Sequence, residues 1–459
     1  EGFKLVFQVM DNEYMRERAD DIEDIGNRLM AALLQKSLRR FPGLTEPSVI
    51  VARDLLPSDT ANLDASLVLG FITAEGGVSS HVAIMAKNRG IPALIGVPEA
   101  IASIQTGDLV AFDAETGEIY IHPDESIQAD FSQRAKELKM KEEALLERAS
   151  SPVVSRDGKT IRVYCNIGSL EELGAAMPYA PDGVGLFRSE FLFMDSDHFP
   201  TEEEQFIAYR EASEKVGKEI TIRTLDIGGD KALSYFTFDN EDNPFLGWRA
   251  IRMTLDMPDL FCTQLRAILR ASAYGSLRIM FPMITSLHEF ERAKALTDEC
   301  KASLKKEGIS FDENIPLGIM VETPAAVFMA EELAKAVDFF SIGTNDLTQY
   351  VLAVDRGNEK IKRMFNSFHP AVLRAIAHVI DSAHKAGIEV GMCGEMAGDL
   401  RATEILLGLG LDEFSMSAQV TPDVKEKIRG LNVSEAAEKA KIALAMSDVD
   451  EIESYLAGG

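Results

Sequence analysis

The stretch LGIMVETPAAVFMAEELAKAVDFFSIGTND, residues 317–346, contains two of eight short apolar runs that follow one another along the chain. Segments with helical periodicity separate most of the runs, and such an alternation of strands and helices predicts a parallel sheet. Eight units over about 290 residues predict a (β/α)8 TIM barrel. An open doubly wound sheet is the alternative, but the chain lacks the early glycine-rich phosphate loop expected of it. In order, the runs are IRVYCNI (161–167), GVGLFR (183–188), ITIRTLDIG (220–228), LRIMFPMI (277–284), LGIMVET (317–323), VDFFSIGTND (337–346), IEVGMCGE (388–395) and DEFSMS (412–417).

Polar side chains gather where these runs end. In (β/α)8 barrels the chemistry is found at the carboxyl ends of the strands. We expect no comparable polar set at the strand starts. Loops are polar in general, and an arginine at a strand end is often only a salt-bridge partner. We nevertheless favour a functional interpretation, because arginines, acids and a cysteine form a chemically coherent set. Its members are Arg188, Arg223, Asp226, Glu322, Asn345, Asp346, Cys393 and Glu395.

The chemistry of this set points to a phosphorylated ligand. Arg188, Arg223 and a third arginine, Arg356, offer forked donors for a multiply charged oxyanion. Glu322 and Asp346 are hard carboxylate ligands suited to Mg²⁺, which also reaches phosphate or carboxylate oxygens of a substrate. Together they predict a site for a small phosphorylated acid with a metal ion. The alternative for Asn345 and Asp346 is that they only cap the N-terminus of a helix.

Cys393 lies between Gly391 and Gly394, and these glycines allow close backbone approach to a ligand. A buried lone cysteine is usually a small inert hydrophobe. Beside arginine and a metal ion, the thiol can instead exchange a proton with a substrate carbon. The spacing leaves both interpretations open.

His81 follows Gly76-Gly77 and stands where a helix is expected to open, around Ser79-Ser80. A neutral imidazole is a competent nucleophile near pH 7, and a helix N-terminus stabilises a phosphoryl group placed there. A surface or capping histidine is the alternative. The other histidines have no such lead-in and are interpreted as structural or solvated: His122, His198, His288, His369, His378 and His384.

The chain before residue 152 divides into three parts. A charged helix is predicted over Asn12–Arg39, within residues 1–41. Residues 42–123 alternate β-like runs with a helix and end in a hairpin signal, which predicts a compact mixed α/β domain. Residues 124–151 read as one charged helix, either a surface helix or a rod or hinge that joins this domain to the barrel at 152–459.

Charge and composition exclude several classes of protein. The 459 residues include 47 Lys plus Arg and 74 Asp plus Glu, a net charge of −27 that disfavours nucleic acid and anionic membranes as partners. Four scattered cysteines indicate neither a disulfide framework nor a zinc finger, and reduced thiols fit a cytoplasmic protein. No apolar stretch of roughly 18 residues predicts a membrane span. The opening at Glu1, without methionine, is that of a fragment.

Several motifs of the sequence resemble those of a known family. The segment GGVSSHVAIMAKNRGIPALIGV, residues 76–97, is similar to the phosphohistidine segment of enzyme I of the bacterial sugar phosphotransferase system. Seven further motifs resemble the phosphoenolpyruvate-binding barrel of enzyme I in the same order, and the resemblance spans about Asn12–Val433. They are GVGLFRSEFLFM, RTLDIGGDK, NPFLGWRAIR, VETPAA, FFSIGTNDLTQY, AVDRGN and GMCGEMAGD.

The resemblance implies a reaction and a role for each residue. His81 would take the phosphoryl group of phosphoenolpyruvate, leaving pyruvate, and pass it to the phosphocarrier protein HPr. Cys393 would protonate the enol carbon. The arginines Arg188, Arg223 and Arg356 would clamp the substrate, with Asn345 beside its phosphate. Glu322 and Asp346 would hold Mg²⁺, and Arg249 and Lys231 would be nearby support. A homodimer through the barrel is also implied.

The resemblance also implies names for the parts and leaves alternatives. Residues 1–41 would be a remnant of the helical domain that docks HPr, so the docking surface would be largely missing. Residues 42–123 would be the swivelling phosphohistidine domain, and 124–151 its hinge. One alternative is a fragment of pyruvate phosphate dikinase or phosphoenolpyruvate synthase, which need an upstream ATP-binding domain. Another is a non-catalytic phosphoenolpyruvate sensor.

Overall fold

The computed structural model describes residues 44–55, 63, 67–76, 82–83, 86, 90–228, 233–358 and 360–457. The chain forms two compact units, Glu1–Lys141 and Glu142–Gly459. Three predicted features lie outside the described residues: the helix over Asn12–Arg39, the nucleophile His81, and Lys231.

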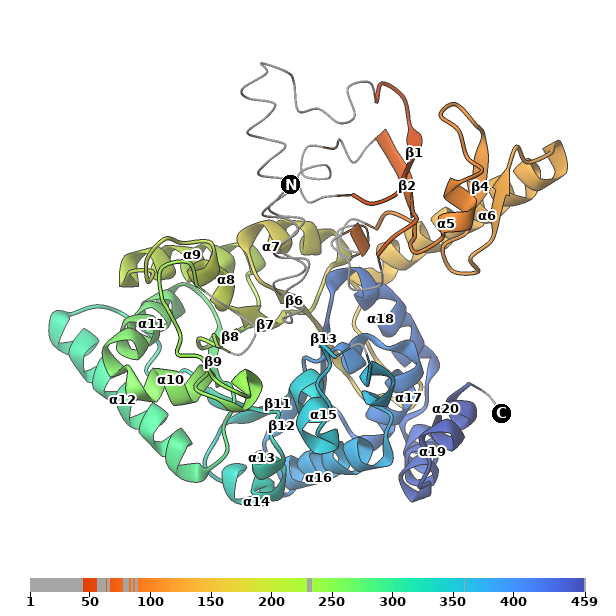
Figure 1. The fold of residues 1–459 in the computed structure, drawn as a ribbon. Helices are drawn as coiled ribbons and strands as arrows, with labels where there is room; N and C mark the ends of the chain where they lie inside the picture. Colours follow the sequence, from red (N-terminus) through yellow and green to blue (C-terminus); the bar gives the residue numbers. More distant parts are fainter. Residues whose placement is uncertain are drawn as a thin grey trace, which may run out of the picture. The chain divides into compact units, whose positions relative to one another are not determined.

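The second unit contains a closed barrel of eight parallel strands, which confirms the predicted (β/α)8 fold (Figure 1). The last strand pairs with the first, Glu413 opposite Arg162, and this pairing closes the ring. Each strand lies within one of the eight apolar runs. Their bounds are β6 (Arg162–Ile167), β7 (Val184–Arg188), β8 (Ile220–Arg223), β9 (Leu277–Phe281), β10 (Leu317–Val321), β11 (Phe339–Ile342), β12 (Glu389–Met392) and β13 (Glu413–Met416).

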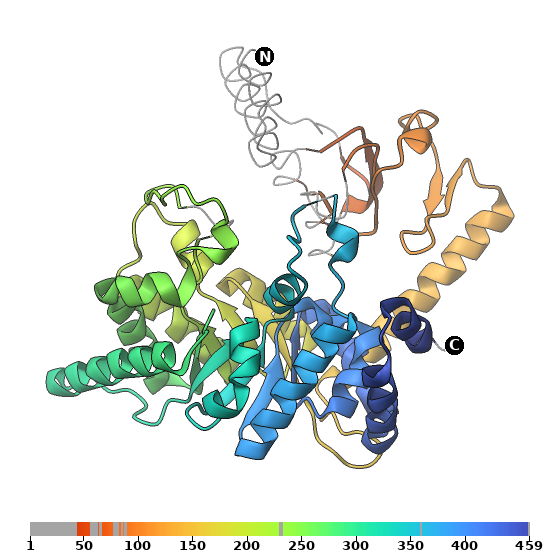
Figure 2. The same cartoon turned by 60° about the horizontal axis from the view of Figure 1, so that its bottom comes forward.

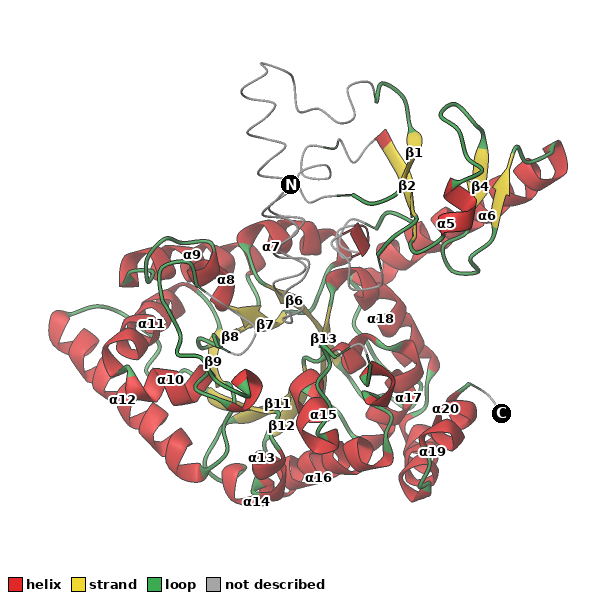
Figure 3. Ribbon diagram, in the orientation of Figure 1, coloured by secondary structure: helices red, strands yellow, loops and turns green. Residues whose placement is uncertain are grey.

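Helices surround this ring, as the yellow strands and red helices of Figure 3 and the turned view of Figure 2 show. Local sequence sets several of their ends: α9 and α12 begin with the capping boxes Thr201–Glu204 and Ser286–Glu289. The helices are α7 (Leu170–Ala176), α8 (Glu190–Met194), α9 (Glu202–Val216), α10 (Ala250–Asp256), α11 (Pro258–Ala271), α12 (Leu287–Glu307), α13 (Pro324–Phe328), α14 (Ala330–Leu333), α15 (Thr344–Leu352), α16 (Pro370–Ala386), α17 (Leu400–Leu409), α18 (Thr421–Gly430), α19 (Val433–Ala445) and α20 (Val449–Leu456).

The strand starts carry an ion network around the buried pair of Arg278 and Glu413, so the expectation that they lack a polar set was wrong. Arg278, the second residue of β9, donates to Glu413 at 2.8 Å and pairs with Glu219 at 3.2 Å. Arg162 pairs with Glu389 at 2.7 Å. These residues close the end of the barrel at which the strands begin. Residues at this end of a (β/α)8 barrel usually stabilise the fold and do not take part in the chemistry.

The first unit holds a small parallel sheet, β1 (Ser48–Ala52), β2 (Val68–Thr73) and β3 (Ala93–Leu94), with the short helix α5 (Pro98–Ile101). The predicted hairpin is present as β4 (Val110–Phe112) and β5 (Ile119–Ile121). The helix α6 (Glu125–Ala149) follows and runs across the boundary between the units. Among the described residues, none of the helices has the length and apolar character that a bilayer crossing requires.

The carboxyl end of α6 is fixed within the second unit by cations of α18. The Lys425 side chain is fully buried, and its Nζ donates to the carbonyl oxygens of Ala149 at 2.9 Å and Ala180 at 2.7 Å. Arg429 donates to the carbonyl oxygens of Arg148 at 3.1 Å and Ser151 at 2.7 Å. The bonds to Arg148, Ala149 and Ser151 satisfy carbonyl groups at and just beyond the helix end, where intrahelical donors run out.

We expect Lys425→Met to destabilise the protein by about 1–3 kcal/mol, because two buried carbonyl oxygens lose their donor. Thermal and urea unfolding of the whole chain measure the change. Lys441→Met is the matched control, since the Lys441 side chain is 69% exposed and its ion pair with Glu438 contributes little. Equal stability of the two variants would show that the buried amine does not hold α6.

Candidate active site at the carboxyl ends of the barrel strands

Most of the predicted site residues lie at the strand ends, on five elements of the barrel, whereas Arg356 follows the helix α15. Arg188 and Arg223 are the last residues of the neighbouring strands β7 and β8, and they stand opposite each other in the pairing register. Glu322 directly follows β10, and Cys393 directly follows β12. Asp346 lies in the first turn of α15, just after β11. Strand pairing therefore brings together residues that are far apart in sequence.

Arg223 is held between two buried carboxylates. Its Nη1 lies 3.1 Å from Asp226 Oδ2, and its Nη2 pairs with Oε1 of Glu190. These acids keep the pKa of Arg223 above its usual value despite burial, so the guanidinium stays charged. Its Nε is buried and has no hydrogen-bond partner among the described residues. That donor therefore has no acceptor within the described part of the chain.

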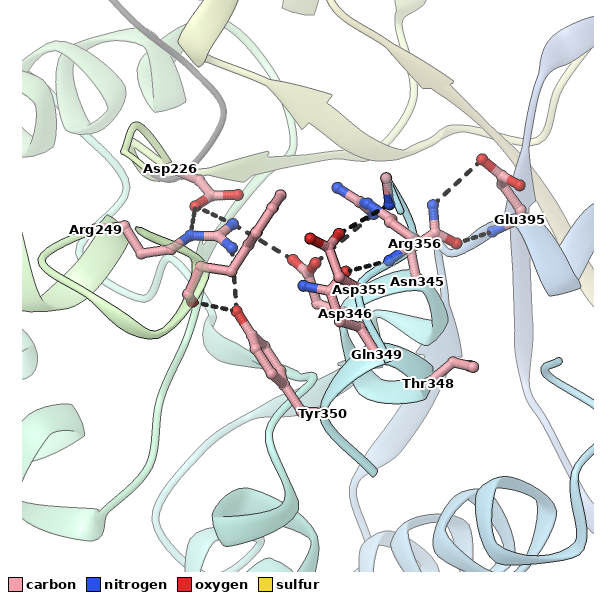
Figure 4. Close-up of polar contacts among 12 residues, drawn as sticks. Asp226, Arg249, Asn345, Asp346, Thr348, Gln349, Tyr350, Asp355, Arg356 and Glu395 are labelled. Carbon is pink, nitrogen blue, oxygen red and sulfur yellow. Dashed lines mark hydrogen bonds and ion pairs between the residues drawn. The ribbon is translucent and has the colours of Figure 1, made fainter. Parts of the chain in front are cut away.

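Asp226 also binds a second buried arginine, Arg249 (Figure 4). Arg249 Nη2 lies 2.9 Å from Asp226 Oδ1 and 3.4 Å from Asp346 Oδ2. Its Nη1 donates to the hydroxyl of Tyr350 at 3.2 Å, and Tyr350 donates in turn to the carbonyl oxygen of Phe245 at 2.5 Å. A chain of charge-assisted bonds therefore links the ends of β8 and β11 with the loop that holds Phe245.

Glu322 is almost fully buried and lies in a region of concentrated negative charge. Burial, followed by repulsion from Asp346 and Asp226, raises the pKa of Glu322 to about 8. The backbone N–H of Met283 donates to Glu322 Oε1 at 2.7 Å. Met283 has a φ of 56°, in the left-handed region that side chains rarely adopt, and this conformation accompanies the bond.

The acids at positions 322 and 346 fit a magnesium ion. Asp346 Oδ1 is buried without a hydrogen-bond partner among the described residues, and its distance to Arg356 Nη1 is 3.6 Å. Within the described ranges no group of three or more His, Cys, Asp or Glu forms a metal cluster. Mg²⁺ commonly takes only one or two protein carboxylates and completes its octahedron with water and substrate oxygens. The buried carboxylate of Glu322 and the unpartnered oxygen of Asp346 match that pattern.

Cys393 lies among apolar side chains in the mouth of the barrel, with Leu186, Met280, Met320 and Phe339. It is 5% exposed, and burial raises the pKa of its thiol to about 11. The sulfur is therefore protonated at neutral pH. A thiol in this state can donate a proton but is a poor nucleophile.

Asn345 and Arg356 border the same region (Figure 4). Asn345 Oδ1 accepts from the backbone N–H of Glu395 at 3.0 Å, and its Nδ2 donates to Glu395 Oε1 at 3.4 Å. Arg188 is exposed and makes no ion pair with another described residue. Its guanidinium is thus uncommitted at the end of β7.

A cavity of about 600 Å³ lies next to this site, but the arginines, carboxylates and cysteine predicted from the sequence do not line it. Met283, which holds Glu322, and Tyr350, which holds Arg249, both line it. Its other walls come mainly from the loop around Phe245 and from the start of α13.

Reasoning from the sequence did not assign a role to three residues that organise this site. Glu190 and Tyr350 were not selected as candidates, although both lie in quoted motifs, and Asp226 was only noted as a strand-end residue. Arg249 came from the resemblance alone. A signal existed for Asp226, because it follows Arg223 by three residues at a strand end. For Glu190 the available signal was an acidic residue two positions after the end of a strand.

Comparison with known proteins gives two family matches and close relatives. Residues 142–433 match the PEP-utilising enzyme, PEP-binding domain, and residues 44–117 match the PEP-utilising enzyme, mobile domain. A phosphoenolpyruvate-protein phosphotransferase of Haemophilus influenzae is 49% identical over 450 residues, 97% of this chain and 78% of the relative. The proteins of the same name from Geobacillus stearothermophilus and Bacillus subtilis are 46% and 45% identical, over 99% of this chain and 79% and 80% of theirs.

Proposed function

The chain belongs to the family of phosphoenolpyruvate-protein phosphotransferases, and we propose that it moves the phosphoryl group of phosphoenolpyruvate onto His81 and releases pyruvate. The observation that carries the proposal is the strand-end constellation. Two buried arginines, a pair of carboxylates suited to Mg²⁺ and a protonated buried thiol lie together at the barrel mouth. This combination matches a substrate with a phosphate, a carboxylate and a carbon that must gain a proton.

In the proposed binding mode, arginines hold the two anionic groups of the substrate. Arg223, Arg188 and Arg356 would contact phosphate and carboxylate oxygens, with Asn345 beside the phosphate. Mg²⁺ held by Glu322 and Asp346 would neutralise charge on these oxygens as the phosphoryl group leaves. Fixed cations aimed at the transferring group are the expected main source of catalysis.

In the proposed reaction, one bond to phosphorus forms and one breaks. A ring nitrogen of His81 attacks phosphorus, and the bond between phosphorus and the enol oxygen breaks. The electron pair stays on the enolate of pyruvate, whose terminal carbon takes the proton of the Cys393 thiol. The thiolate then regains a proton from solvent. Transfer onward to HPr is the second part of the proposed reaction.

Three further points belong to the proposal. Residues 124–151, which contain α6, would act as the hinge that lets the phosphohistidine domain, residues 42–123, approach the barrel. A homodimer through the barrel is supported by large exposed apolar side chains on that unit, Leu246, Phe328 and Met364. A cytoplasmic location is supported by four cysteines that are free of disulfides.

Intact-mass spectrometry after incubation with phosphoenolpyruvate and Mg²⁺ tests the function. We expect one added phosphate that is lost in acid, as a phosphohistidine is, and no addition when EDTA removes the metal ion. Labelling by ATP in place of phosphoenolpyruvate would favour a dikinase or synthase fragment. Binding of phosphoenolpyruvate without any added mass would favour a sensor, and either result would overturn the proposal.

A further inference from the structure

We propose that Glu190 is a positioning residue that fixes the guanidinium of Arg223 for phosphoryl transfer, an inference that rests on the proposed function. Glu190 is the first residue of α8, two residues after Arg188 at the end of β7. It is 1% exposed, and its carboxylate pairs with Arg223 Nη2. A carboxylate is costly to bury, so its place beside the proposed substrate clamp requires a reason.

The segment that contains Glu190 contacts both the backbone and the side chain of Arg223. The hydroxyl of Ser189 donates to the carbonyl oxygen of Arg223 at 2.7 Å. Gln264 of α11 donates to that same hydroxyl at 3.0 Å and accepts from the backbone N–H of Leu225 at 2.8 Å. The carbonyl group of Arg223 and the N–H of Leu225 are thus tied to one buried network. Glu190 adds the contact at the far tip of the side chain.

The two carboxylates determine which part of Arg223 remains available. Glu190 takes Nη2 on one side, while Asp226 takes Nη1 at 3.1 Å on the other. Nη1 also lies 3.6 Å from the sulfur of Met320. The buried Nε keeps its proton without a hydrogen-bond partner among the described residues. The two carboxylates therefore fix the orientation of the whole guanidinium, including that of Nε.

Glu190 is expected to affect orientation more than affinity. Its negative charge partly cancels the attraction of Arg223 for an anionic substrate, so the acid does not serve binding strength. An arginine paired on one side only would be free to rotate about its terminal bonds. Displacing a reacting or clamping group by about 1 Å costs about 100-fold in rate.

Glu190→Gln tests the proposal, because glutamine keeps the shape and an acceptor but removes the charge. We expect the single-turnover rate of phosphorylation by phosphoenolpyruvate to fall about 10- to 100-fold. The half-saturating phosphoenolpyruvate concentration should stay the same or fall. Glu190→Asp, which keeps the charge on a shorter side chain, should lose part of the rate and serves if the first variant does not fold.

Glu413→Gln is the matched control at the opposite end of the barrel. Glu413 is also a buried acid that accepts from a buried arginine, Arg278, at 2.8 Å. A general loss of stability would appear in both variants, whereas a loss of rate should appear only at position 190. Thermal unfolding measured beside the rates separates the two effects.

A double-mutant cycle with Arg223→Lys shows whether Glu190 acts through this arginine. If it does, Glu190→Gln should cause little further loss of rate in the Arg223→Lys background. An unchanged rate in Glu190→Gln, a loss expressed only as weaker binding, or an equal loss in both backgrounds would overturn the inference. Failure of the unaltered protein to become phosphorylated would instead overturn the proposed function.

Discussion

Replacing His81 with alanine is expected to abolish covalent phosphorylation of the protein by phosphoenolpyruvate. A ring nitrogen of the His81 imidazole would form the new bond to phosphorus, and alanine offers no nucleophile. Removing a nucleophile typically lowers a rate on the order of 10⁶-fold, which places the product below detection by intact-mass spectrometry. Binding of phosphoenolpyruvate and Mg²⁺ should persist, because the proposed ligands belong to the barrel. Isothermal titration measures that binding.

His378→Ala is the control for this experiment. His378 is exposed on α16 of the barrel, and its loss should leave phosphorylation intact. Persistent labelling of the His81→Ala protein would show that the nucleophile has been assigned wrongly. Fragmentation of the labelled chain would then locate the phosphate on another residue. Loss of both labelling and binding would point to a folding defect, which circular dichroism detects.

The barrel was predictable because each strand and helix carries its own local signal. The run LRIMF became β9, and the capping box at Ser286–Glu289 began α12 where the periodicity placed a helix. Eight such units leave few closed parallel architectures. The fold therefore depends on a pattern that repeats, and an error in one unit does not change the outcome.

The site was predictable only where chemistry coincides with a strand end. Arg223 and Glu322 stand at such ends, and their residue types suggest their use. Glu190 was not selected because its contact with Arg223 joins positions 33 residues apart, within a segment that reads as an apolar helix. No spacing rule connects those positions. Only the pairing of β7 with β8 brings the ends of these two strands side by side.

The same limit explains the wrong expectation at the strand starts. Arg278 and Glu413 are each embedded in an apolar run, and they are 135 residues apart. A charged residue inside such a run looks like an isolated exception. In the barrel both residues lie near the starts of their strands, β9 and β13, where each side chain compensates the charge of the other. Pairing of buried charges is a tertiary property and leaves no local trace.

Replacing Cys393 with serine is expected to slow pyruvate formation by about 10²- to 10⁴-fold, the usual contribution of a general acid. Burial raises the pKa of the Cys393 thiol to about 11, so the proton is present throughout the neutral range and is lost only as the pH rises toward that value. A serine hydroxyl is a weaker acid and holds its proton more firmly. Binding of phosphoenolpyruvate should change little, because serine is similar in size and the arginine clamp is retained.

Cys165→Ser separates this role from the packing of a buried thiol. Cys165 lies in β6, is fully buried, and burial likewise raises the pKa of its thiol to about 12. Serine there should cost stability without slowing the reaction. With phosphoenolpyruvate that carries tritium at one position of its terminal carbon, and with D2O as solvent, the unaltered protein and Cys165→Ser should protonate a single face and give a chiral methyl group of one configuration. Cys393→Ser should lose this selectivity, since solvent reaches both faces of a released enolate. Retained selectivity, or equal losses of rate and binding, would make Cys393 a structural residue, because a proton donor acts on the reacting carbon and not on the ground-state complex.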